Sequence, residues 1–368
     1  MITLNNAPKI SVIMSVYNGE EYLSATLESI IRQTFNDWEL VVINDCSTDS
    51  TISVLTEYAA KDPRIKVHTN EVNLRLPASL NKAVSLSRGK YIARMDADDI
   101  CLPKRLEKQY KFMEENKDVQ LSSCRFMTLR NGVYSSGGCG ARCDNEALRT
   151  MLLVTNPILH PGVIAKADIM KAFAYNPECT CTEDLNLWTR LALSDIKMQI
   201  QPEYLLIYRL HDKQITSTTL EKQRNEVLKI QKNYFGSKIA VIDEKTEDFY
   251  IDGIYFKNIR DINKFCSFFE NVRKTNKIKK SFSEKDLKYA FFEVLAEYKR
   301  RGISKKDLLK AMLKLGPLFV FCEILRRKSC AAKDGKACIR AASEAGLVQT
   351  SGTKLFPIFS ETKQEENQ

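Results

Sequence analysis

The stretch "ISVIMSVYNGEEYLSATLESIIRQTFNDWELVVIND", residues Ile10–Asp45, decides the fold. It begins with a continuous apolar run at Ile10–Val16, which is typical of a strand buried on both faces. A segment with apolar residues at helical spacing follows at Tyr22–Phe35, and a second apolar run follows at Trp38–Asn44. A strand–helix–strand unit of this kind predicts two parallel strands joined by a helix that covers one face of the sheet.

The same alternation continues to about residue 130, with helices predicted at 50–61, 77–89 and 103–116 and strands at 65–69 and 90–95. These segments predict an α/β fold with a mostly parallel central sheet flanked by helices. Farther on, Asn131-Gly132 predicts a hairpin turn, and we expect helices at 144–154, 166–174 and 182–194 and a strand at 203–210. From about Leu220 the chain reads as helical and lysine-rich, and its last ~30 residues are small and polar, which indicates poor order.

Composition narrows the class of protein. The chain has 368 residues, 44% of them hydrophobic, which is enough for a full core and for more than one domain. No apolar run of about 18 residues occurs, and the start "MITLNNAPKI" lacks the parts of a secretory signal. The 11 cysteines include no CxxC pair, so we expect reduced thiols in a cytoplasmic protein rather than a disulfide framework, and a zinc site is the second interpretation.

Three carboxylates close the apolar run at 90–95, namely Asp96, Asp98 and Asp99. Ligands of open parallel sheets bind beyond the carboxyl ends of the strands, where we also expect the loops "YNGEE" and "NDCSTD". Asp45 in the second loop could accept from a base or a ribose, and Asp96 and Asp98 could share a divalent cation. Hard oxygen ligands favour Mg²⁺ or Mn²⁺. The alternative is a solvated turn with an acidic helix N-terminus.

Five segments, in this order along the chain, resemble those of the family 2 glycosyltransferases with the GT-A fold, of the bacterial surface-polysaccharide type: "ISVIMSVYNGEEYLSATLESIIRQTFNDWELVVINDCSTDST", "SLNKAVSLSRGKYIARMDADDICLPKRLEKQ", "HPGVIAKADI", "TEDLNLWTRLA" and "YRLHDKQIT". Cys46 departs from the pattern, since a second Asp or a Gly is common there, and "NLRLPAS" lacks the usual glycine. The QxxRW motif of processive synthases is absent, which indicates transfer of one sugar per binding event.

The resemblance covers the chain from about Lys9 to about Ser217 and implies its domain organisation. A GT-A catalytic domain is expected over residues 1–218, with a nucleotide-binding half at 1–130 and an acceptor half at 131–218. A helical region is expected at 219–330 and a poorly ordered tail at 331–368.

For the donor, a UDP-sugar, the resemblance implies four contacts. Asp45 would hold the uracil, and Tyr17 would lie against its ring. Glu20 is included among the donor-binding residues, and Asp96 would reach the ribose.

For the metal, Mn²⁺ or Mg²⁺, the resemblance implies that Asp98 is a direct ligand, that Asp96 acts partly through a bound water, and that His211 is near the ion or the diphosphate. Asp184 in "TED" would be the catalytic base, because the attacking hydroxyl must lose its proton. Thr182 is a candidate N-cap, which would put Asp184 in a first helical turn, where the dipole favours its ionised form. Without the resemblance, "TED" would be taken as a plain capping motif.

Together these expectations describe a non-processive, inverting hexosyltransferase that moves a sugar from a UDP-sugar to a saccharide or polyprenyl-diphosphate-linked acceptor, in polysaccharide, O-antigen or capsule biosynthesis. A nucleotidyltransferase would need a glycine- and lysine-rich loop after the first strand, and "VYNGEE" does not supply one. The other alternative is an inactive sugar-nucleotide-binding partner in a polysaccharide assembly complex.

The net charge of +10 allows a polyanionic partner. Basic and apolar residues interleave over 303–330, as in segments that lie peripherally on the inner face of a cell membrane. Each Lys or Arg near anionic lipid adds about 1 kcal/mol. The alternative is an amphipathic helix packed on the catalytic domain. Nucleic acid is not expected as a partner, because aromatic residues are not interleaved with basic ones at the spacing of a known module.

Overall fold

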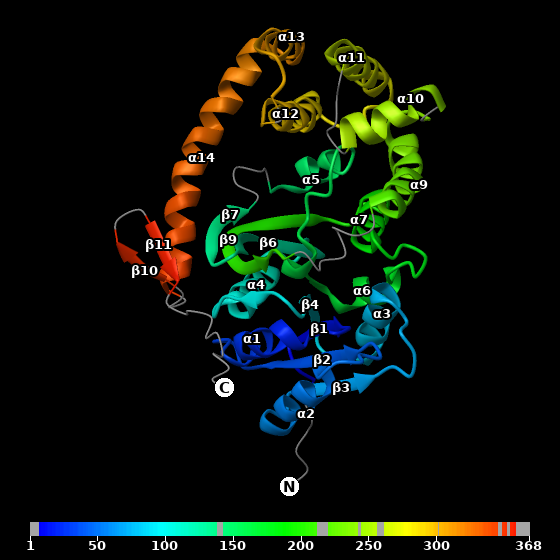
Figure 1. Ribbon diagram of the computed structural model, residues 1–368. Coiled ribbons are helices and arrows are strands. Elements are labelled where there is room, and N and C mark those ends of the chain that lie inside the picture. Colours follow the sequence, from blue (N-terminus) through cyan, green and yellow to red (C-terminus); the bar gives the residue numbers. More distant parts are fainter. Residues whose placement is uncertain are drawn as a thin grey trace, which may run out of the picture.

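The computed structural model describes residues 7–137, 143–211, 220–241, 244–255, 261–300, 302–344, 348–351 and 354–357. Within these residues, nine strands form one sheet in the order β3-β2-β1-β4-β8-β6-β9-β5, with β7 paired to β6 (Figure 1). The strands are β1 (Ile10–Val16), β2 (Trp38–Asn44), β3 (Ile65–Thr69), β4 (Tyr91–Arg94), β5 (Ile100–Cys101), β6 (Leu121–Arg130), β7 (Val133–Gly137), β8 (Ile164–Lys166) and β9 (Met198–Arg209).

Helices alternate with the strands through the first two thirds of the chain. They are α1 (Glu20–Ile31), α2 (Thr51–Lys61), α3 (Leu76–Leu86), α4 (Arg105–Glu115), α5 (Asn145–Met151), the short 3₁₀ turn η1 (His160–Gly162), α6 (Ala167–Phe173) and α7 (Glu183–Leu193). Every helix predicted for this part of the chain is present, with boundaries that differ by a few residues.

Both faces of β1 are buried, as its continuous apolar run predicted. Val12 and Met14 pack with Leu27 of α1 on one face, whereas Ile13 packs with Leu80 of α3 on the other. The neighbours of β1 are β2 and β4, and both pair with it in parallel. The parallel sheet predicted for the first four strands is therefore confirmed.

Beyond β4 the strands run in both directions. β8 joins β4 to β6 through antiparallel pairs, while β6 and β9 are parallel. The hairpin predicted at Asn131-Gly132 links β6 to β7, and both turn residues have positive φ, 50° and 73°. β8 and β5 were not predicted, because two or three residues are too short for a hydrophobic period to be recognised.

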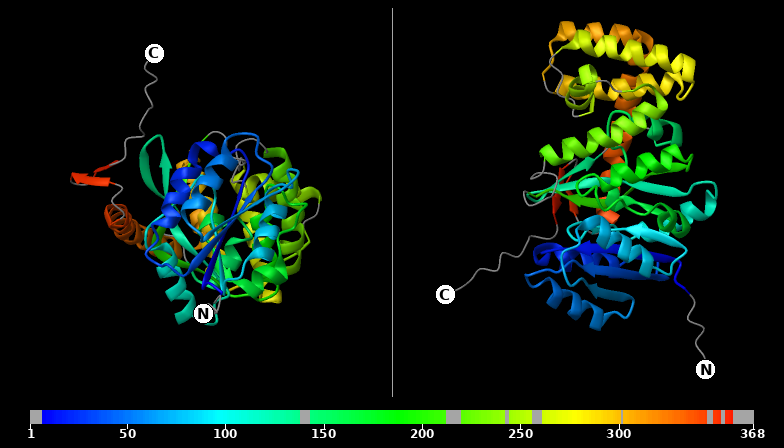
Figure 2. Two further views of the ribbon diagram at one scale, coloured as in Figure 1. Left: turned by 90° about the horizontal axis from the view of Figure 1, so that it is seen from below. Right: turned by 90° about the vertical axis from the view of Figure 1, so that its right-hand side faces the viewer.

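The C-terminal third is a group of helices: α9 (Leu220–Lys238), α10 (Glu244–Asp248), the π-helical turn η2 (Phe249–Tyr255), α11 (Ile262–Lys279), α12 (Glu284–Arg300), α13 (Lys305–Leu315) and α14 (Pro317–Glu344). Their core is continuous with that of the sheet domain, since Phe265 and Phe291 belong to the same buried cluster as Trp188 of α7. Figure 2 shows α11, α12 and α13 stacked at the end of the molecule away from β1–β3.

α14 runs back from this end toward the sheet and contacts β9 and β7 (Figure 1). An antiparallel hairpin of β10 (Val348–Ser351) and β11 (Lys354–Pro357) follows it. The tail expected to be poorly ordered from residue 331 thus contains helix as far as Glu344 and a hairpin, while residues 358–368 lie outside the described part. Among the described helices, none has the length and apolar character needed to cross a bilayer.

Candidate functional site

The carboxylates of Asp96, Asp98 and Asp99 gather beyond the end of β4. One oxygen from each lies within 4.8 Å of the others. Asp96 and Asp98 are half-buried, with side-chain exposures of 27% and 28%, whereas Asp99 is fully buried. The acidic triplet is therefore a cluster folded against the sheet and not a solvated turn.

The end of β9 holds this cluster from one side. The backbone N–H of Arg209 donates to Asp99 Oδ1 over 2.9 Å, and Arg209 Nε donates to the carbonyl oxygen of Asp98, also over 2.9 Å. Two residues later, His211 Nε2 lies 2.9 Å from Asp98 Oδ2. Asp98 and His211, both predicted to be near the metal, are thus brought together from positions 113 residues apart.

Helix α1 holds the same loop from the other side. The Thr26 hydroxyl lies 2.8 Å from the carbonyl oxygens of both Ala97 and Asp99. The ring centroids of Tyr22 and His211 lie 4.9 Å apart. The Arg209 guanidinium lies over the Tyr22 ring, with its Cζ 4.6 Å from the ring centroid. Sequence analysis missed Tyr22 and Thr26, because nothing in a helical pattern indicates which polar residue of the buried face reaches a distant loop.

The charge of the cluster is only partly balanced. Arg94, the last residue of β4, is buried and forms an ion pair with Asp96. Burial, together with the charges of Asp96 and Asp98, raises the pKa of the Asp99 carboxyl well above its usual value. Asp99 Oδ2 is buried and has no hydrogen-bond partner among the described residues. Three close carboxylates with one unsatisfied oxygen fit a divalent cation, whose charge would offset their repulsion.

Tyr17 and Asp45 lie side by side at the same sheet edge. Val16 pairs with Asn44 in the parallel register of β1 and β2, so the next residue of each strand is Tyr17 and Asp45. Asp45 is buried, and its Oδ1 accepts hydrogen bonds from Asn70 Nδ2 (2.7 Å) and from the N–H of Leu74 (2.8 Å). The Tyr17 ring is 52% exposed, which leaves a face available for a planar ligand.

Glu20, also expected to contact the donor, joins two loops of this edge. Its Oε2 accepts a hydrogen bond from the N–H of Ser50, and its own N–H donates to Asp49 Oδ2, over 2.8 and 3.2 Å. These contacts tie the loop after β1 to the loop after β2. Contact between Glu20 and the UDP-sugar stays a prediction. The observed hydrogen bonds support a role of Glu20 in holding the two loops together.

Asp184 lies in the first turn of α7, as predicted from "TED". Its Oδ2 accepts from Asn156 Nδ2 over 2.7 Å, and its Oδ1 accepts from the N–H of Leu185 over 2.6 Å. Thr182 occupies the N-cap position, but its hydroxyl donates to Glu226 Oε2, so the expected side-chain cap is replaced by a tertiary contact. Burial, followed by the charge of Glu183, raises the pKa of Asp184, which opposes the helix dipole that we expected to favour ionisation.

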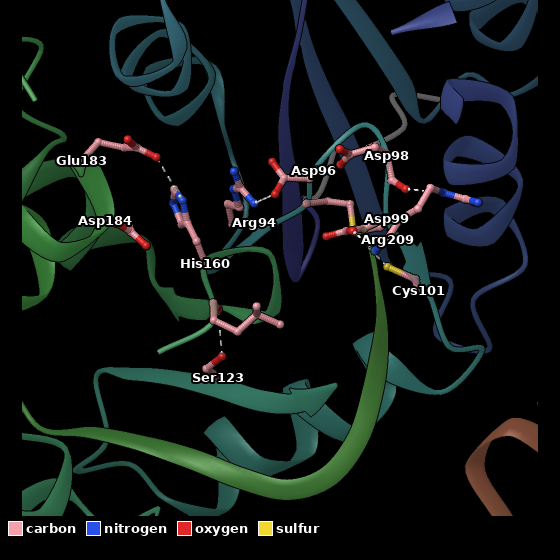
Figure 3. A network of polar contacts seen from close by, with 12 residues as sticks. Arg94, Asp96, Asp98, Asp99, Cys101, Ser123, His160, Glu183, Asp184 and Arg209 are labelled. Carbon is pink, nitrogen blue, oxygen red and sulfur yellow. Dashed lines mark hydrogen bonds and ion pairs between the residues drawn. The ribbon is translucent and has the colours of Figure 1, made fainter. Parts of the chain in front are cut away.

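Buried polar residues lie between Asp184 and the carboxylate cluster (Figure 3). His160 Nε2 lies 2.8 Å from the Tyr175 hydroxyl, and His160 Nδ1 lies 3.5 Å from Glu183 Oε1. Burial raises the pKa of Glu183 to about 7 and lowers that of His160 to about 3. Figure 3 shows Arg94 between His160 on one side and Asp96 on the other, with Asp184 on the side of His160.

Comparison with known proteins identifies glycosyltransferases as similar to this chain. A family model described as "Glycosyl transferase family 2" matches residues 11–157. An uncharacterized glycosyltransferase of Methanocaldococcus jannaschii is 35% identical over 227 residues, which cover 61% of this chain and 78% of that protein. The O-antigen biosynthesis glycosyltransferase WbnJ of Escherichia coli is 33% identical over 217 residues, covering 57% and 83% of the two chains.

Among solved structures, the crystal structure of S. aureus TarS 1-349 in complex with UDP-GlcNAc matches with a TM-score of 0.55. The match is 18% identical in sequence and covers 96% of this chain and 97% of that one. At this identity the likeness is one of fold, and it confirms the GT-A fold, with its helical C-terminal region, that was predicted from the sequence.

Proposed function

This chain belongs to glycosyltransferase family 2, and we propose that it transfers single sugars, with inversion, from a UDP-sugar to a hydroxyl group of a saccharide or polyprenyl-diphosphate-linked acceptor. The observation that carries the proposal is the cluster of Asp96, Asp98 and Asp99, whose carboxylate oxygens lie within 4.8 Å of one another at the carboxyl end of β4. That is the sheet edge at which ligands bind in open α/β folds.

The proposed donor site uses Tyr17, Asp45 and Asp96. Asp45 would accept a hydrogen bond from the uracil, because its carboxylate is already fixed by Asn70 and Leu74. The exposed Tyr17 ring would stack on the base. The structural relative TarS was solved with UDP-GlcNAc, which supports a uridine nucleotide while leaving the sugar open.

Asp96, Asp98 and His211 would hold the cation, which we propose is Mn²⁺ or Mg²⁺. Asp99 would contribute from behind, because its buried Oδ2 is otherwise unpaired among the described residues. A divalent ion bound to these oxygens stabilises the charge of a departing diphosphate. Arg94 would orient Asp96 through their ion pair, and Arg209 fixes the loop backbone through Asp98 and Asp99.

Asp184 is the proposed catalytic base. It would accept the proton of the acceptor hydroxyl as that oxygen attacks the anomeric carbon, and Asn156 would hold its carboxylate in one orientation. Its raised pKa increases its strength as a base, provided that the group is ionised at the working pH. One base and a direct displacement imply inversion at the anomeric carbon.

The biological setting that we propose is the assembly of a bacterial surface polysaccharide such as O-antigen or capsule. The relative WbnJ is named for O-antigen biosynthesis, which supports this setting. UDP-sugars would be met in the cytoplasm, and a lipid-linked acceptor would be met at the inner face of the cell membrane. In this setting contact with the membrane would be peripheral.

Release of UDP from a panel of UDP-sugars, with and without Mn²⁺, tests the proposal. We expect metal-dependent UDP release with one or a few donors, and its loss in Asp98→Asn. The matched control is Asp118→Asn, which changes an exposed carboxylate paired with Lys197 and should release UDP like the wild type. Calorimetric binding of UDP without release of UDP from any donor, across a broad set of acceptors, would instead identify an inactive sugar-nucleotide-binding partner.

A further inference from the structure

Two consecutive C-terminal helices present an apolar surface to solvent. Their exposed apolar side chains recur every three or four residues within each helix, so in each helix they share one face. We call these five residues the apolar stripe; their exposed fractions are 58%, 58%, 75%, 59% and 49% for Leu309, Leu313, Leu318, Phe321 and Leu325.

The helices that carry the apolar stripe are packed against the protein on their other side. Ala311 and Leu315 of α13 and Val320 of α14 are completely buried, so the opposite faces of both helices pack into the protein. An amphipathic helix packed on the rest of the molecule explains those buried residues. It leaves the five outward apolar side chains unexplained. Exposed apolar residues gathered on one helix face often mark an interaction site.

Positive charge surrounds the stripe. The exposed basic residues of the same segment are Lys305, Lys306, Lys310, Lys314 and Lys328. Residues 305–328 contain only two acidic side chains, Asp307 and Glu323. Asp307 Oδ2 accepts from the Ser304 hydroxyl over 2.7 Å, and Glu323 is buried in an ion pair with Arg326. Lys314 is paired with Glu270 of α11, and Lys310 donates to Asn263 Oδ1. The positive charge of the outward surface is therefore carried mainly by Lys305, Lys306 and Lys328.

The location of the stripe leaves it accessible. Figure 1 shows α13 at the end of the molecule opposite to α2 and β3, with α14 descending from it along the outside. The parts of the sheet that carry the acceptor-side residues, β6 and β9, lie between the stripe and the nucleotide-binding strands (Figure 1). A flat partner could reach α13 and the first turns of α14 without meeting the nucleotide-binding half.

We propose that the apolar stripe and its lysines form a docking face for a membrane surface that contains anionic lipid. The leucines and the phenylalanine enter the boundary between headgroups and acyl chains, and the lysines lie among the anionic headgroups. A second copy of this chain fits the face less well, because a two-fold contact would bring the lysines of one copy against those of the other. The proposal goes beyond sugar transfer and does not depend on which donor is used.

Flotation of the full-length protein with lipid vesicles tests the proposal. We expect binding to vesicles of phosphatidylcholine mixed with phosphatidylglycerol, weaker binding to phosphatidylcholine alone, and release at high salt. The double variant Leu318→Glu, Phe321→Glu should lower the bound fraction by about tenfold or more, because it removes two inserted side chains and adds two repelled charges. Val133→Glu, Val241→Glu is the matched control, with two exposed apolar residues outside the stripe.

A second variant separates charge from insertion. Lys305→Gln, Lys306→Gln should weaken binding to the mixed vesicles several-fold and leave the weak binding to phosphatidylcholine unchanged. Equal flotation of wild type and Leu318→Glu, Phe321→Glu would overturn the proposal. So would a dimer, detected by sedimentation, that this double variant dissociates. UDP release in solution should be the same for all these variants, so a failure of docking is distinguishable from a failure of the proposed enzyme activity.

Discussion

His211 Nε2 lies 2.9 Å from Asp98 Oδ2, although the two residues reach this point from different strands. The histidine follows β9, and the aspartate follows β4. Because an imidazole nitrogen and a carboxylate oxygen this close can share one cation, the pair identifies which of the three histidines of the chain belongs to the proposed metal site.

Replacing His211 tests this pairing. His211→Ala should raise the Mn²⁺ concentration needed for half-maximal UDP release by about tenfold, since one ligand or its support is lost. The control is His68→Ala, which removes a half-buried imidazole from β3. A half-saturating Mn²⁺ concentration equal to that of the wild type would place His211 outside the metal site.

Asp184→Asn removes the proposed proton acceptor and keeps the shape of the side chain. We expect transfer to an acceptor to fall by about 100-fold to 10,000-fold, while calorimetry still detects UDP binding. Asp168→Asn is a closely matched control, because Asp168 is exposed in the first turn of α6 and its Oδ1 also accepts from the following N–H, at 2.8 Å. Similar losses in the two variants would contradict a role for Asp184 in catalysis.

Glu183 should make stability depend on pH. Burial raises its pKa from 4.5 to about 7, so the folded protein holds this proton more tightly than the unfolded chain does. The stabilising contribution is therefore present below about pH 4.5 and is lost as the pH rises through 7. His160, with its pKa lowered to about 3, acts in the opposite direction, because stability is lost as the pH falls below its ordinary value of 6.5.

Urea unfolding of Glu183→Gln and wild type at pH 5 and pH 8 isolates the contribution of Glu183. The variant should gain free energy of unfolding relative to wild type on going from pH 5 to pH 8, by at most about 2.5 kcal/mol. Glu178→Gln, on an exposed residue of the preceding loop, should show no such gain. A difference that is the same at both pH values would mean that Glu183 is ionised throughout.

Thr26→Val should remove the hydrogen bonds that tie α1 to the loop containing Asp96, Asp98 and Asp99. The valine keeps the shape of the side chain but leaves the carbonyl oxygens of Ala97 and Asp99 without the hydroxyl now 2.8 Å from each. We expect a loss of about 1–2 kcal/mol in the free energy of unfolding, measured in urea. Thr56→Val in α2, whose hydroxyl bonds only to Ile52 one turn earlier in its own exposed helix, should cost less.

Local sequence patterns were enough to predict the parallel strands β1–β4 and the helices between them. All residues of Ile10–Val16 except Ser11 and Ser15 are apolar. Such a run is typical of a central strand that is buried on both faces. The turn at Asn131-Gly132 was predictable because both residues tolerate positive φ. Asp96 and Asp98 stood out since carboxylates at a strand end are costly without a partner.

Long-range contacts were the part that sequence reasoning could not supply. The pairing of His160 with Glu183 depends on how η1 and α7 approach one another, and no local period encodes that distance. Thr182 is another example. Its hydroxyl was expected to cap α7 but donates a hydrogen bond to Glu226 of α9 instead. The three-residue strand β8 is defined by its neighbours and not by its own residues.

One consequence follows from the buried cluster that Trp188 shares with Phe265 and Phe291. Cutting the chain where the family motifs stop, near residue 218, would remove α9, which packs on α7, and would expose part of this shared core to water. The C-terminal helices and the part of the sheet domain that shares their core should accordingly unfold together as one cooperative unit, so that a fragment ending near residue 218 should not be stable.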